Sequence, residues 1–348
     1  MTTNAERALA ASGCDALIAS NPTTVTWLTG FAPDVIFGPS PFAAPPLAVV
    51  RRDGSVVALV SSDEAPALTG CEVCEYEGFT TGPLDPHARQ RDALGSLALR
   101  GRVGIEAESL AVALAPVGAI DVATALSRLR AVKSEAELDL IRAAIGLCDV
   151  GQAVARAGYR AGRDELALWA EIQAAIEAAA GQRTPLLCDL VTGPRTAEVG
   201  GLPGHRTVEE GDLAIVDIVP RLAGYWGDSC STLVAGEPPD GAREQHARCV
   251  EALELGIAAI RPGVVAGELD QLIRAGLDYP HHSGHGCGTA LHEEPRIVPG
   301  GETVLAAGMV IALEPGAYPG PWGMRVERVV VVTDDGCETL STHDLALA

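Results

Sequence analysis

The C-terminal two thirds of the chain carries one order of elements twice, in which two helix-like segments are followed by strand-like segments. In sequence order they are a helix that begins after Ser134, a helix over about 164–181, strands over 186–192, 213–219 and 225–234, helices over about 243–260 and 268–274, and strands around Val310 and Val329. Two such halves facing each other make a cleft lined by sheet, and side chains from both halves can meet in it.

Capping signals support the first two helices. Ser134 and Glu137 have the spacing of a capping box, and the apolar residues that follow repeat at helical intervals. The next helix begins at about Asp164 and ends before Gly181, a residue suited to the left-handed conformation that closes helices. The sequence therefore predicts a pair of amphipathic helices ahead of the first strands.

With 348 residues the chain is long enough for two domains, each with its own core. Residues 1–122 alternate helix-like and strand-like pieces, including a hairpin formed by 47–50, a turn at Asp53-Gly54 and 56–60. We expect a smaller α/β domain over 1–122 and a second domain over 123–348. The Pro-rich stretch 33–46 is expected to be a surface loop that reaches a neighbouring subunit or the mouth of the site.

Charge and composition exclude several classes of partner. The formal net charge is -21 and the basic residues do not cluster, which argues against nucleic acid and anionic membranes as partners. The N-terminus lacks a basic leader with an apolar core, and the apolar stretch 110–120 is interrupted by Pro116 and Gly118, so no membrane span is expected. Nine cysteines without framework spacing fit reduced thiols, and a cytoplasmic protein is expected.

Acidic residues interrupt segments that otherwise look buried. Asp217 lies in LAIVDIV, Glu314 in MVIALEPG and Glu327 in MRVERVVVV. Asp228 follows Asp217 with ten residues between them, across the turn at Ala223-Gly224, so both side chains can project toward one point. An unpaired carboxylate is costly to bury, which favours metal ligands; the alternative for the two aspartates is a position on solvated strands.

A second constellation is HHSGHGCGTALHEEP at 281–295, where histidines and glutamates stand among glycines. His281, His285 and His292 are interpreted as a ligand with proton-handling partners, whereas His282 has no assigned role and is expected to be exposed. Four carboxylates and one neutral imidazole would neutralise most of the charge of two divalent cations, and a water between such ions would lose a proton near neutral pH.

Arg325 lies two residues before Glu327 and so on the same face of the strand. Two alternatives stay open for its guanidinium. It could hold a substrate carboxylate through paired hydrogen bonds, or it could form an ion pair with a structural acid.

These segments, together with SNPTTVTWLTGF at 20–31 and LRAVKSEAELDLIRAA at 129–144, resemble the pita-bread metallopeptidases, which include Xaa-Pro dipeptidases, aminopeptidases P, methionine aminopeptidases and creatinase. The resemblance covers nearly the whole chain and favours the prolidase and creatinase branch. It implies an α+β fold, with a C-terminal pita-bread domain that contains a pseudo-twofold repeat, preceded by a creatinase N-terminal-like α/β domain.

The resemblance also implies roles for single residues. The ligands of two Mn, Co or Zn ions would be Asp217, Asp228, His285, Glu314 and Glu327. Glu314 would also handle the proton of the water that bridges the ions, while His292 and His281 would stabilise the tetrahedral intermediate and assist the leaving nitrogen.

The sequence departs from the family pattern beside the proposed ligands. Gly200 stands seventeen residues before Asp217, where these peptidases carry a substrate-contacting histidine, and His205 is out of register. The stretch DSCST after Asp228 lacks an arginine that is common there, and Val219 replaces a usual glycine. A rearranged substrate pocket is therefore expected.

The resemblance implies an Xaa-Pro dipeptidase that cleaves the bond between an N-terminal residue and proline by attack of a hydroxide bridging two divalent metals. The alternatives are an aminopeptidase P-like enzyme acting on longer peptides, a creatinase-like small-molecule C–N hydrolase, and a non-catalytic peptide-binding module. Creatinase-like members and binding modules generally lose acidic ligands, and all five positions are filled here. A homodimer is expected from the resemblance alone.

Overall fold

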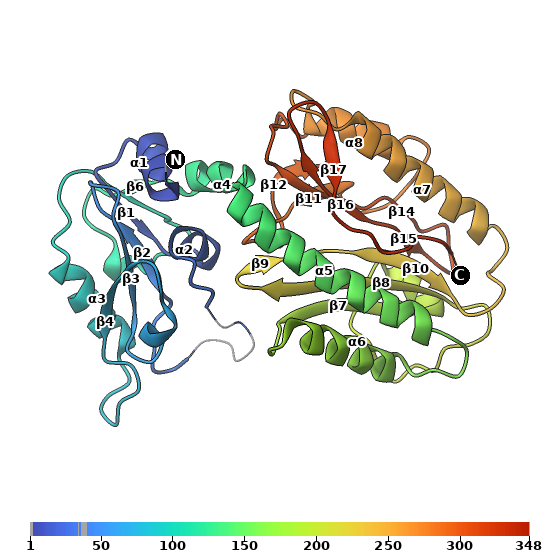
Figure 1. Cartoon of the computed structure of the whole chain (residues 1–348), viewed down its shortest axis with the longest axis horizontal. Helices are drawn as coiled ribbons and strands as arrows, with labels where there is room; N and C mark the ends of the chain where they lie inside the picture. Colours follow the sequence, from blue (N-terminus) through green and yellow to red (C-terminus); the bar gives the residue numbers. More distant parts are fainter. Residues whose placement is uncertain (1–2, 34, 36–39, 348) are drawn as a thin grey trace. The chain divides into compact units, whose positions relative to one another are not determined.

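The computed structural model describes residues 3–33, 35 and 40–347 (Figure 1). The chain separates into two compact units, Met1–Arg130 and Ala131–Ala348. The boundary predicted between residues 122 and 123 precedes this division by one helix, α4 (Ala123–Ala131), and stays a prediction. Of the predicted loop 33–46, residues 34 and 36–39 lie outside the described part of the chain. Within the described part, no helix is long and apolar enough to span a membrane.

The first unit is built on a six-stranded mixed sheet with the order β4-β3-β2-β1-β5-β6. Its strands are β1 (Ala16–Ala19), β2 (Leu47–Val50), β3 (Val56–Ser61), β4 (Glu72–Tyr76), β5 (Val103–Ile105) and β6 (Ile120–Asp121), and its helices are α1 (Asn4–Ser12), α2 (Pro22–Thr29), α3 (Pro86–Ser96), the short 3-10 turns at Ala65–Ala67 and Val112–Leu114, and α4. Strand β1 pairs antiparallel with β2 and parallel with β5. This confirms the α/β character predicted for the first part of the chain.

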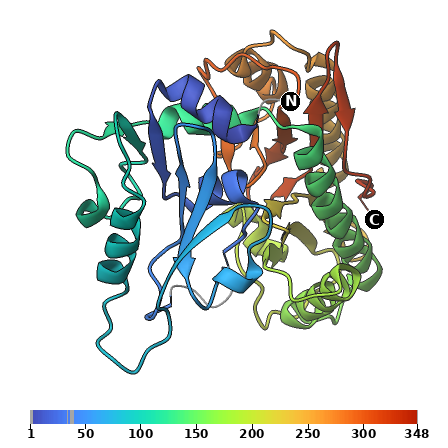
Figure 2. The same cartoon turned by 60° about the vertical axis from the view of Figure 1, so that its left-hand side comes forward.

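Side chains alternate across this sheet and bury both of its faces. Leu17 of β1 packs with Ala8 of α1 and Trp27 of α2, whereas its neighbour Ile18 packs in the cluster that contains Leu94 of α3. Helix α3, in teal, lies beside the blue strands in Figure 2. The predicted hairpin is confirmed as β2 and β3, which pair antiparallel around a turn where Gly54 has a φ of 82°.

The second unit contains the repeated order of elements. The first repeat comprises α5 (Glu135–Gly158), α6 (Glu165–Ala180), β7 (Leu186–Thr192), a 3-10 turn at Gly193–Glu198, β8 (Leu213–Leu222), β9 (Tyr225–Trp226) and β10 (Cys230–Val234). The second comprises α7 (Ala242–Ala259), α8 (Ala266–Arg274), β11 (Gly284–Gly286), β12 (Glu293–Ile297), β13 (Val310–Leu313), β14 (Gly316–Ala317), β15 (Met324–Arg325), β16 (Arg328–Val332) and β17 (Cys337–Thr339). The prediction of two helices followed by strands, used twice, is therefore confirmed.

Each repeat contributes a sheet covered by its own helices (Figure 1). The first sheet has the order β10-β8-β7, with β9 beside β8, and its outer face packs against α5 and α6. The second has the order β12-β11-β13-β16-β17 and packs against α7 and α8. Its other face meets the start of α5 through Val329 and Val331. Burial on both faces explains the unbroken valine run 329–332.

The helix caps agree with the sequence. Ser134 and Glu137 form both hydrogen bonds of a capping box at the start of α5, and the Asp164 side chain accepts a hydrogen bond from the Ala167 N–H at the start of α6. Helix α6 ends at Gly181 in the left-handed conformation, with a φ of 67°. The starts of α5 and α6 and the end of α6 therefore lie where the capping residues predicted them.

The strand predicted over 225–234 was wrong as a single element. It is broken into β9 and β10, because the chain at Gly227 passes close to α5 and leaves the ladder. A Cβ at Gly227 would lie 2.6 Å from the carbonyl oxygen of Ala144, so only glycine fits this approach. Asp228 consequently lies in the break between two strands and not within one.

Candidate metal centre

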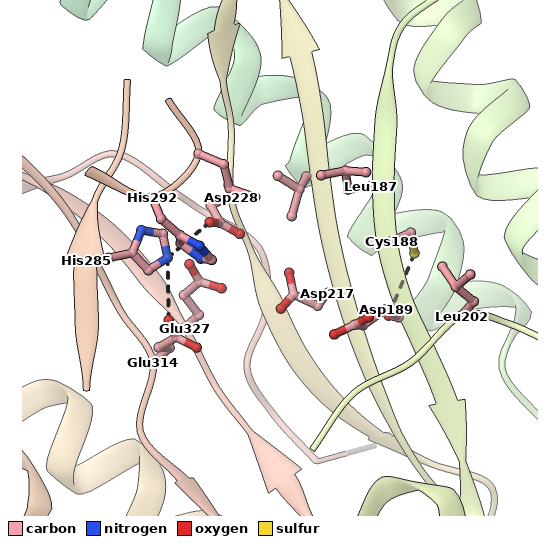
Figure 3. A pocket seen from close by; sticks show the side chains of 12 residues that line it. Leu187, Cys188, Asp189, Leu202, Asp217, Asp228, His285, His292, Glu314 and Glu327 are labelled. Atoms are coloured by element: carbon pink, nitrogen blue, oxygen red, sulfur yellow. Dashed lines mark hydrogen bonds and ion pairs between the residues drawn. The ribbon is translucent and has the colours of Figure 1, made fainter. Parts of the chain in front are cut away.

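The five predicted ligands come from separate elements of the second unit and meet at one cavity of about 310 Å³ (Figure 3). Asp217 lies in β8 and Asp228 in the break before β10, both from the first repeat. From the second repeat, His285 lies in β11, Glu314 directly follows β13, and Glu327 directly precedes β16. The structure therefore brings together all five residues that the sequence singled out.

Strand alternation places Asp217 on the inner face of its sheet. Its neighbours Val216 and Ile218 pack into the core beneath α5 and α6. Asp217 and Val219, two residues apart, instead line the cavity. On the facing strands, Asp217 is the register partner of Cys230 in β10 and of Asp189 in β7.

The donor atoms are close enough to share a cation. His285 Nε2 lies 3.5 Å from Asp228 Oδ2 and 3.4 Å from Glu314 Oε1. One donor atom each from Asp228, His285 and Glu327 lie within 4.8 Å of one another. The imidazole is also oriented, because its Nδ1 is 3.0 Å from the carbonyl oxygen of Gly286. Donation from Nδ1–H to that carbonyl leaves the Nε2 lone pair directed at the acids.

Glycines allow the histidine strand to pass between its neighbours. A Cβ at Gly284 would lie 2.3 Å from the Ala312 carbonyl oxygen, and a Cβ at Gly286 would lie 2.1 Å from the Glu294 carbonyl oxygen. Larger residues at either position would push β11 away from β13 or β12. The glycines around His285 therefore fix how deeply the imidazole enters the cavity.

Burial shapes the electrostatics of the acids. It raises the pKa of Asp228 and Glu327 well above their ordinary values, and the neighbouring carboxylates add to this rise. Burial also raises the pKa of Asp217 to about 6, although the positive charge of Arg325 opposes it. Without a cation, ionised acids this close to one another and largely buried repel one another.

Glu314 behaves differently from the other acids. Burial acts to raise its pKa, but a hydrogen bond from His282 and the proximity of His285 outweigh burial and lower the pKa to about 2. Burial lowers the pKa of His285 to about 3, so this imidazole is neutral at neutral pH and can offer a lone pair. The site thus combines an ionised glutamate with a neutral histidine.

The residues present fit divalent cations. Asp217 Oδ1 and Glu327 Oε1 are both buried, and within the described residues neither has a hydrogen-bond partner. A buried carboxylate oxygen without a donor is costly unless a cation takes that place. Carboxylate oxygens with one imidazole nitrogen form a donor set typical of Zn, Mn and related ions.

Arg325 lies against the first aspartate, and its side chain is only 5% exposed. Its Nη2 is 2.6 Å from Asp217 Oδ2, and its Nη1 donates to the carbonyl oxygen of Val199 at 2.9 Å. The second alternative drawn from the sequence was an ion pair with a structural acid; Arg325 does form an ion pair, but its partner is Asp217, one of the proposed ligands. Binding of a substrate carboxylate by Arg325 stays a prediction.

The predicted catalytic histidines occupy different places. His292 lines the cavity. His281 is outside the cavity lining; its Nε2 is 3.0 Å from the hydroxyl of Tyr318 and its Nδ1 is 3.9 Å from Glu314 Oε2. The expectation that His282 is exposed was wrong, since its side chain is 16% exposed and its Nε2 lies 2.6 Å from Glu314 Oε1. Glu314, directly after β13, makes this contact with His282, which the spacing of the motif could not reveal.

The space beside Gly200, where the family carries a histidine, is occupied by a side chain of β7. A Cβ at Gly200 would lie 2.0 Å from Asp189 Oδ2, so the Asp189 carboxylate occupies the space next to that glycine. His205 does not replace it, because its side chain is 84% exposed and its Nδ1 lies 3.3 Å from Asp164 Oδ2. Asp189 lines the cavity and was missed from the sequence; the signal was an acid in the centre of the strand-like segment 186–192.

Comparison with known proteins agrees with this geometry. A model described as metallopeptidase family M24 matches residues 139–334, and a model of the creatinase/prolidase N-terminal domain matches residues 2–143. These two matches together extend over nearly all of the chain.

Among similar sequences is the probable dipeptidase PepE of Mycobacterium tuberculosis, 35% identical over 323 residues, which cover 88% of this chain and 83% of that protein. The Xaa-Pro dipeptidase of Pyrococcus furiosus is 32% identical over 227 residues, which cover 63% of this chain and 65% of that protein. The crystal structure of the prolidase from Pyrococcus horikoshii superimposes with a TM-score of 0.84 at 23% identity and covers 99% of both chains. The likeness to that structure confirms the predicted fold, a creatinase-type N-terminal domain followed by a pita-bread domain.

Proposed function

The chain belongs to metallopeptidase family M24, and from this membership we propose that it is an Xaa-Pro dipeptidase, which hydrolyses the bond between an N-terminal residue and proline. The observation that carries the proposal is the convergence of Asp217, Asp228, His285, Glu314 and Glu327 on one cavity. Similar proteins named Xaa-Pro dipeptidase support the choice of substrate.

In this proposal the five residues hold two divalent cations, either Mn, Co or Zn. Bound cations would lower the pKa of a shared water to near neutrality and so supply the nucleophile. The first repeat contributes two of the carboxylates, and the second contributes the imidazole and the other two. The ligands are thus spread over both repeats, and a cation would draw together strands that are far apart in the sequence.

The remaining chemistry is assigned to residues around the ligands. Glu314 has a pKa lowered to about 2 and is ionised at neutral pH, so its carboxylate can accept the proton of the attacking water. His292 lines the cavity, and burial lowers its pKa, so a neutral imidazole there can donate one N–H to the carbonyl oxygen of the scissile bond. His281 would assist the leaving nitrogen through the hydroxyl of Tyr318, 3.0 Å from its Nε2.

The size of the cavity supports a dipeptide over a longer peptide. Its volume of about 310 Å³ lies at the lower end of the range of small-molecule sites, roughly 300–1,000 Å³. A dipeptide fits such a space, whereas the rest of a longer substrate would have to leave it. An aminopeptidase P-like activity on longer peptides is the alternative that the experiment below addresses.

The test is turnover by metal-reconstituted protein. We expect hydrolysis of Xaa-Pro dipeptides, slower hydrolysis of a pentapeptide with the same first two residues, and loss of both after dialysis against a chelator. Faster cleavage of the pentapeptide would favour the aminopeptidase P-like alternative. Turnover that survives the chelator would favour a creatinase-like C–N hydrolase, and metal binding without turnover of any peptide would favour a binding module.

The wider setting of the enzyme is also part of the proposal. All nine cysteines are free thiols, which supports a reducing compartment and therefore the cytoplasm. A homodimer is proposed from the family resemblance. Fractionation of cells that produce the protein tests its cytoplasmic location, and light scattering of the purified protein tests the homodimer.

A further inference from the structure

The cavity contains a carboxylate that the proposed metal centre does not use. Five acids line it, and four of them, Asp217, Asp228, Glu314 and Glu327, are proposed ligands. The fifth is Asp189 of β7, the register partner of Asp217 on the neighbouring strand. In Figure 3 it lies beside Asp217, on the side away from His285.

Asp189 is open to solvent, in contrast to the ligands. Its side chain is 39% exposed, whereas that of Asp217 is 16% exposed. Its nearest cation is Arg325 Nη2, at 3.6 Å from its Oδ2, and the same nitrogen is 2.6 Å from Asp217 Oδ2. Arg325 therefore donates its hydrogen bond to Asp217, and across the described residues no group donates one to the Asp189 carboxylate. This carboxylate retains capacity for another cationic partner.

Apolar side chains border the space in front of Asp189. Leu187 and Leu202 line the cavity and are 52% and 78% exposed, so their side chains are open to contact with a bound molecule. Leu291 and Val219 also line the cavity. Within the described residues, no lysine or arginine is among the residues that line it. A carboxylate bordered by apolar side chains can bind a lysine or arginine side chain, whose aliphatic stem packs on the apolar residues while its cationic end pairs with the carboxylate.

We propose that Asp189 makes this cavity selective for peptides whose residue before proline is lysine or arginine. In this assignment the ammonium or guanidinium meets the Asp189 carboxylate, and the stem packs on Leu187 and Leu202. The inference rests on the proposed function, since it places the scissile bond at the metal centre. Both Asp189 Oδ2 and Asp217 Oδ2 lie within 4 Å of one guanidinium nitrogen. Asp189 therefore lies near Asp217, one of the proposed ligands.

Glycine at position 200 leaves room for this carboxylate. The loop that carries Gly200 and Gly201 returns over β7, where the Leu190 N–H donates to the Gly201 carbonyl oxygen at 3.0 Å. Because a Cβ at Gly200 would lie 2.0 Å from Asp189 Oδ2, the side chain of a histidine or any other residue at 200 would displace the acid. Glycine at 200 and aspartate at 189 thus belong to one arrangement, which explains the departure noted in the sequence.

Two simpler roles for Asp189 predict a different dependence of activity on the substrate. It could balance the charge of Arg325, or it could bind the free α-ammonium that every Xaa-Pro dipeptide carries. Either role affects all dipeptides alike. Recognition of a basic side chain affects only dipeptides that have one, so the ratio between a charged and an uncharged substrate of equal length separates these cases.

The experiment compares Lys-Pro with norleucyl-proline, in which the tip of the side chain is a methyl group, on the metal-reconstituted full chain. We expect wild type to have a kcat/KM for Lys-Pro about tenfold higher, the lower end of the range for a charge-assisted hydrogen bond. Asp189→Asn should lower this ratio to near one. Because the ratio is measured on one preparation, a reduced fraction of folded protein cancels. Glu198→Gln is the matched control, an exposed acid on the turn after β7 that is outside the cavity lining, and should retain the wild-type ratio.

Binding of the free amino acids gives a second measurement, by calorimetry with L-lysine and L-norleucine. We expect L-lysine to bind wild type more tightly and Asp189→Asn to remove the difference. Equal kcat/KM values in wild type, or a loss in Asp189→Asn shared equally by both dipeptides, would overturn the inference and leave the dipeptidase in place. Absence of turnover together with a preference for L-lysine that depends on Asp189 would overturn the proposed function and retain this recognition.

Discussion

Replacement of Asp228 by asparagine should stabilise the metal-free protein while it abolishes metal binding. Donor oxygens of Asp228 and Glu327 lie within 4.8 Å of each other in a buried site. Two unit charges at that distance repel by roughly 3 kcal/mol at an effective dielectric constant of about 20. The raised pKa values of Asp228 and Glu327 mean that these carboxyls are protonated part of the time, which reduces this repulsion. We therefore expect Asp228→Asn to raise the free energy of unfolding by about 1–3 kcal/mol. For a unit of this size the melting temperature would rise by about 2–10 °C.

The assay is thermal unfolding at pH 7.5 in chelator and again in saturating Mn²⁺. Wild type should gain stability on adding the ion, by about 2.7 kcal/mol at a concentration a hundredfold above Kd, and the variant should gain much less. Elemental analysis should find about two ions per chain in wild type. Asp139→Asn, an acid on α5 whose side chain is 78% exposed, controls for the change in net charge. A variant that melts below wild type in chelator, yet gains as much from Mn²⁺, would refute the reasoning.

Four further outcomes follow from the same contacts. Glu314→Gln should lower kcat by about 10²–10⁴-fold in a single-turnover assay, because the carboxylate that accepts the proton is lost. Arg325→Met should lower the free energy of unfolding by about 3–5 kcal/mol in urea titrations, since it leaves Asp217 buried without its partner. Gly284→Ala should destabilise by more than about 1 kcal/mol and weaken Mn²⁺ binding in calorimetry, because the new methyl group lies 2.3 Å from the Ala312 carbonyl oxygen. In chelator, the free energy of unfolding should fall as pH rises from about 4 to 6. In this range the folded carboxyl of Asp217, with its pKa raised to about 6, retains a proton that the unfolded chain has released, and this difference contributes up to about 3 kcal/mol to stability at low pH. Asp217→Asn should remove this pH dependence from the urea midpoints.

The acids of the site could be predicted from the sequence because the free-energy cost of burying a carboxylate can be inferred from its immediate neighbours in the chain. An aspartate within LAIVDIV has apolar neighbours on both sides, so burial of its strand forces its carboxylate into a cavity or against a cation. Helix ends were predictable for the same reason: the Ser134 cap and the Gly181 conformation depend on residues within one turn. Burial of Glu314 and Glu327 beside valine-rich strands follows the same local pattern.

Contacts that depend on tertiary packing were not predictable. Whether His282 faced solvent or Glu314 depended on where the chain places the residue after β13, which no residue near 282 encodes. The role of Asp189 in the cavity depended on the loop at Gly200 closing over β7, and a strand-like segment with one acid is also consistent with an exposed edge. The break at Gly227 likewise arises from the approach of α5, a segment some eighty residues earlier in the chain.

One hydrogen bond between the two repeats lies directly beside the acids of the site. The backbone N–H of Glu327, from the second repeat, donates to the carbonyl oxygen of Cys230, from the first, at 3.0 Å. Cys230 is the register partner of Asp217, so this one hydrogen bond connects the strands that carry ligands from both repeats. Repulsion between the carboxylates acts to separate these strands, and a bound cation acts to hold them together. Metal affinity and the packing of the two repeats are therefore coupled, and a substitution that loosens the contact between β10 and β15 should weaken metal binding without touching a ligand.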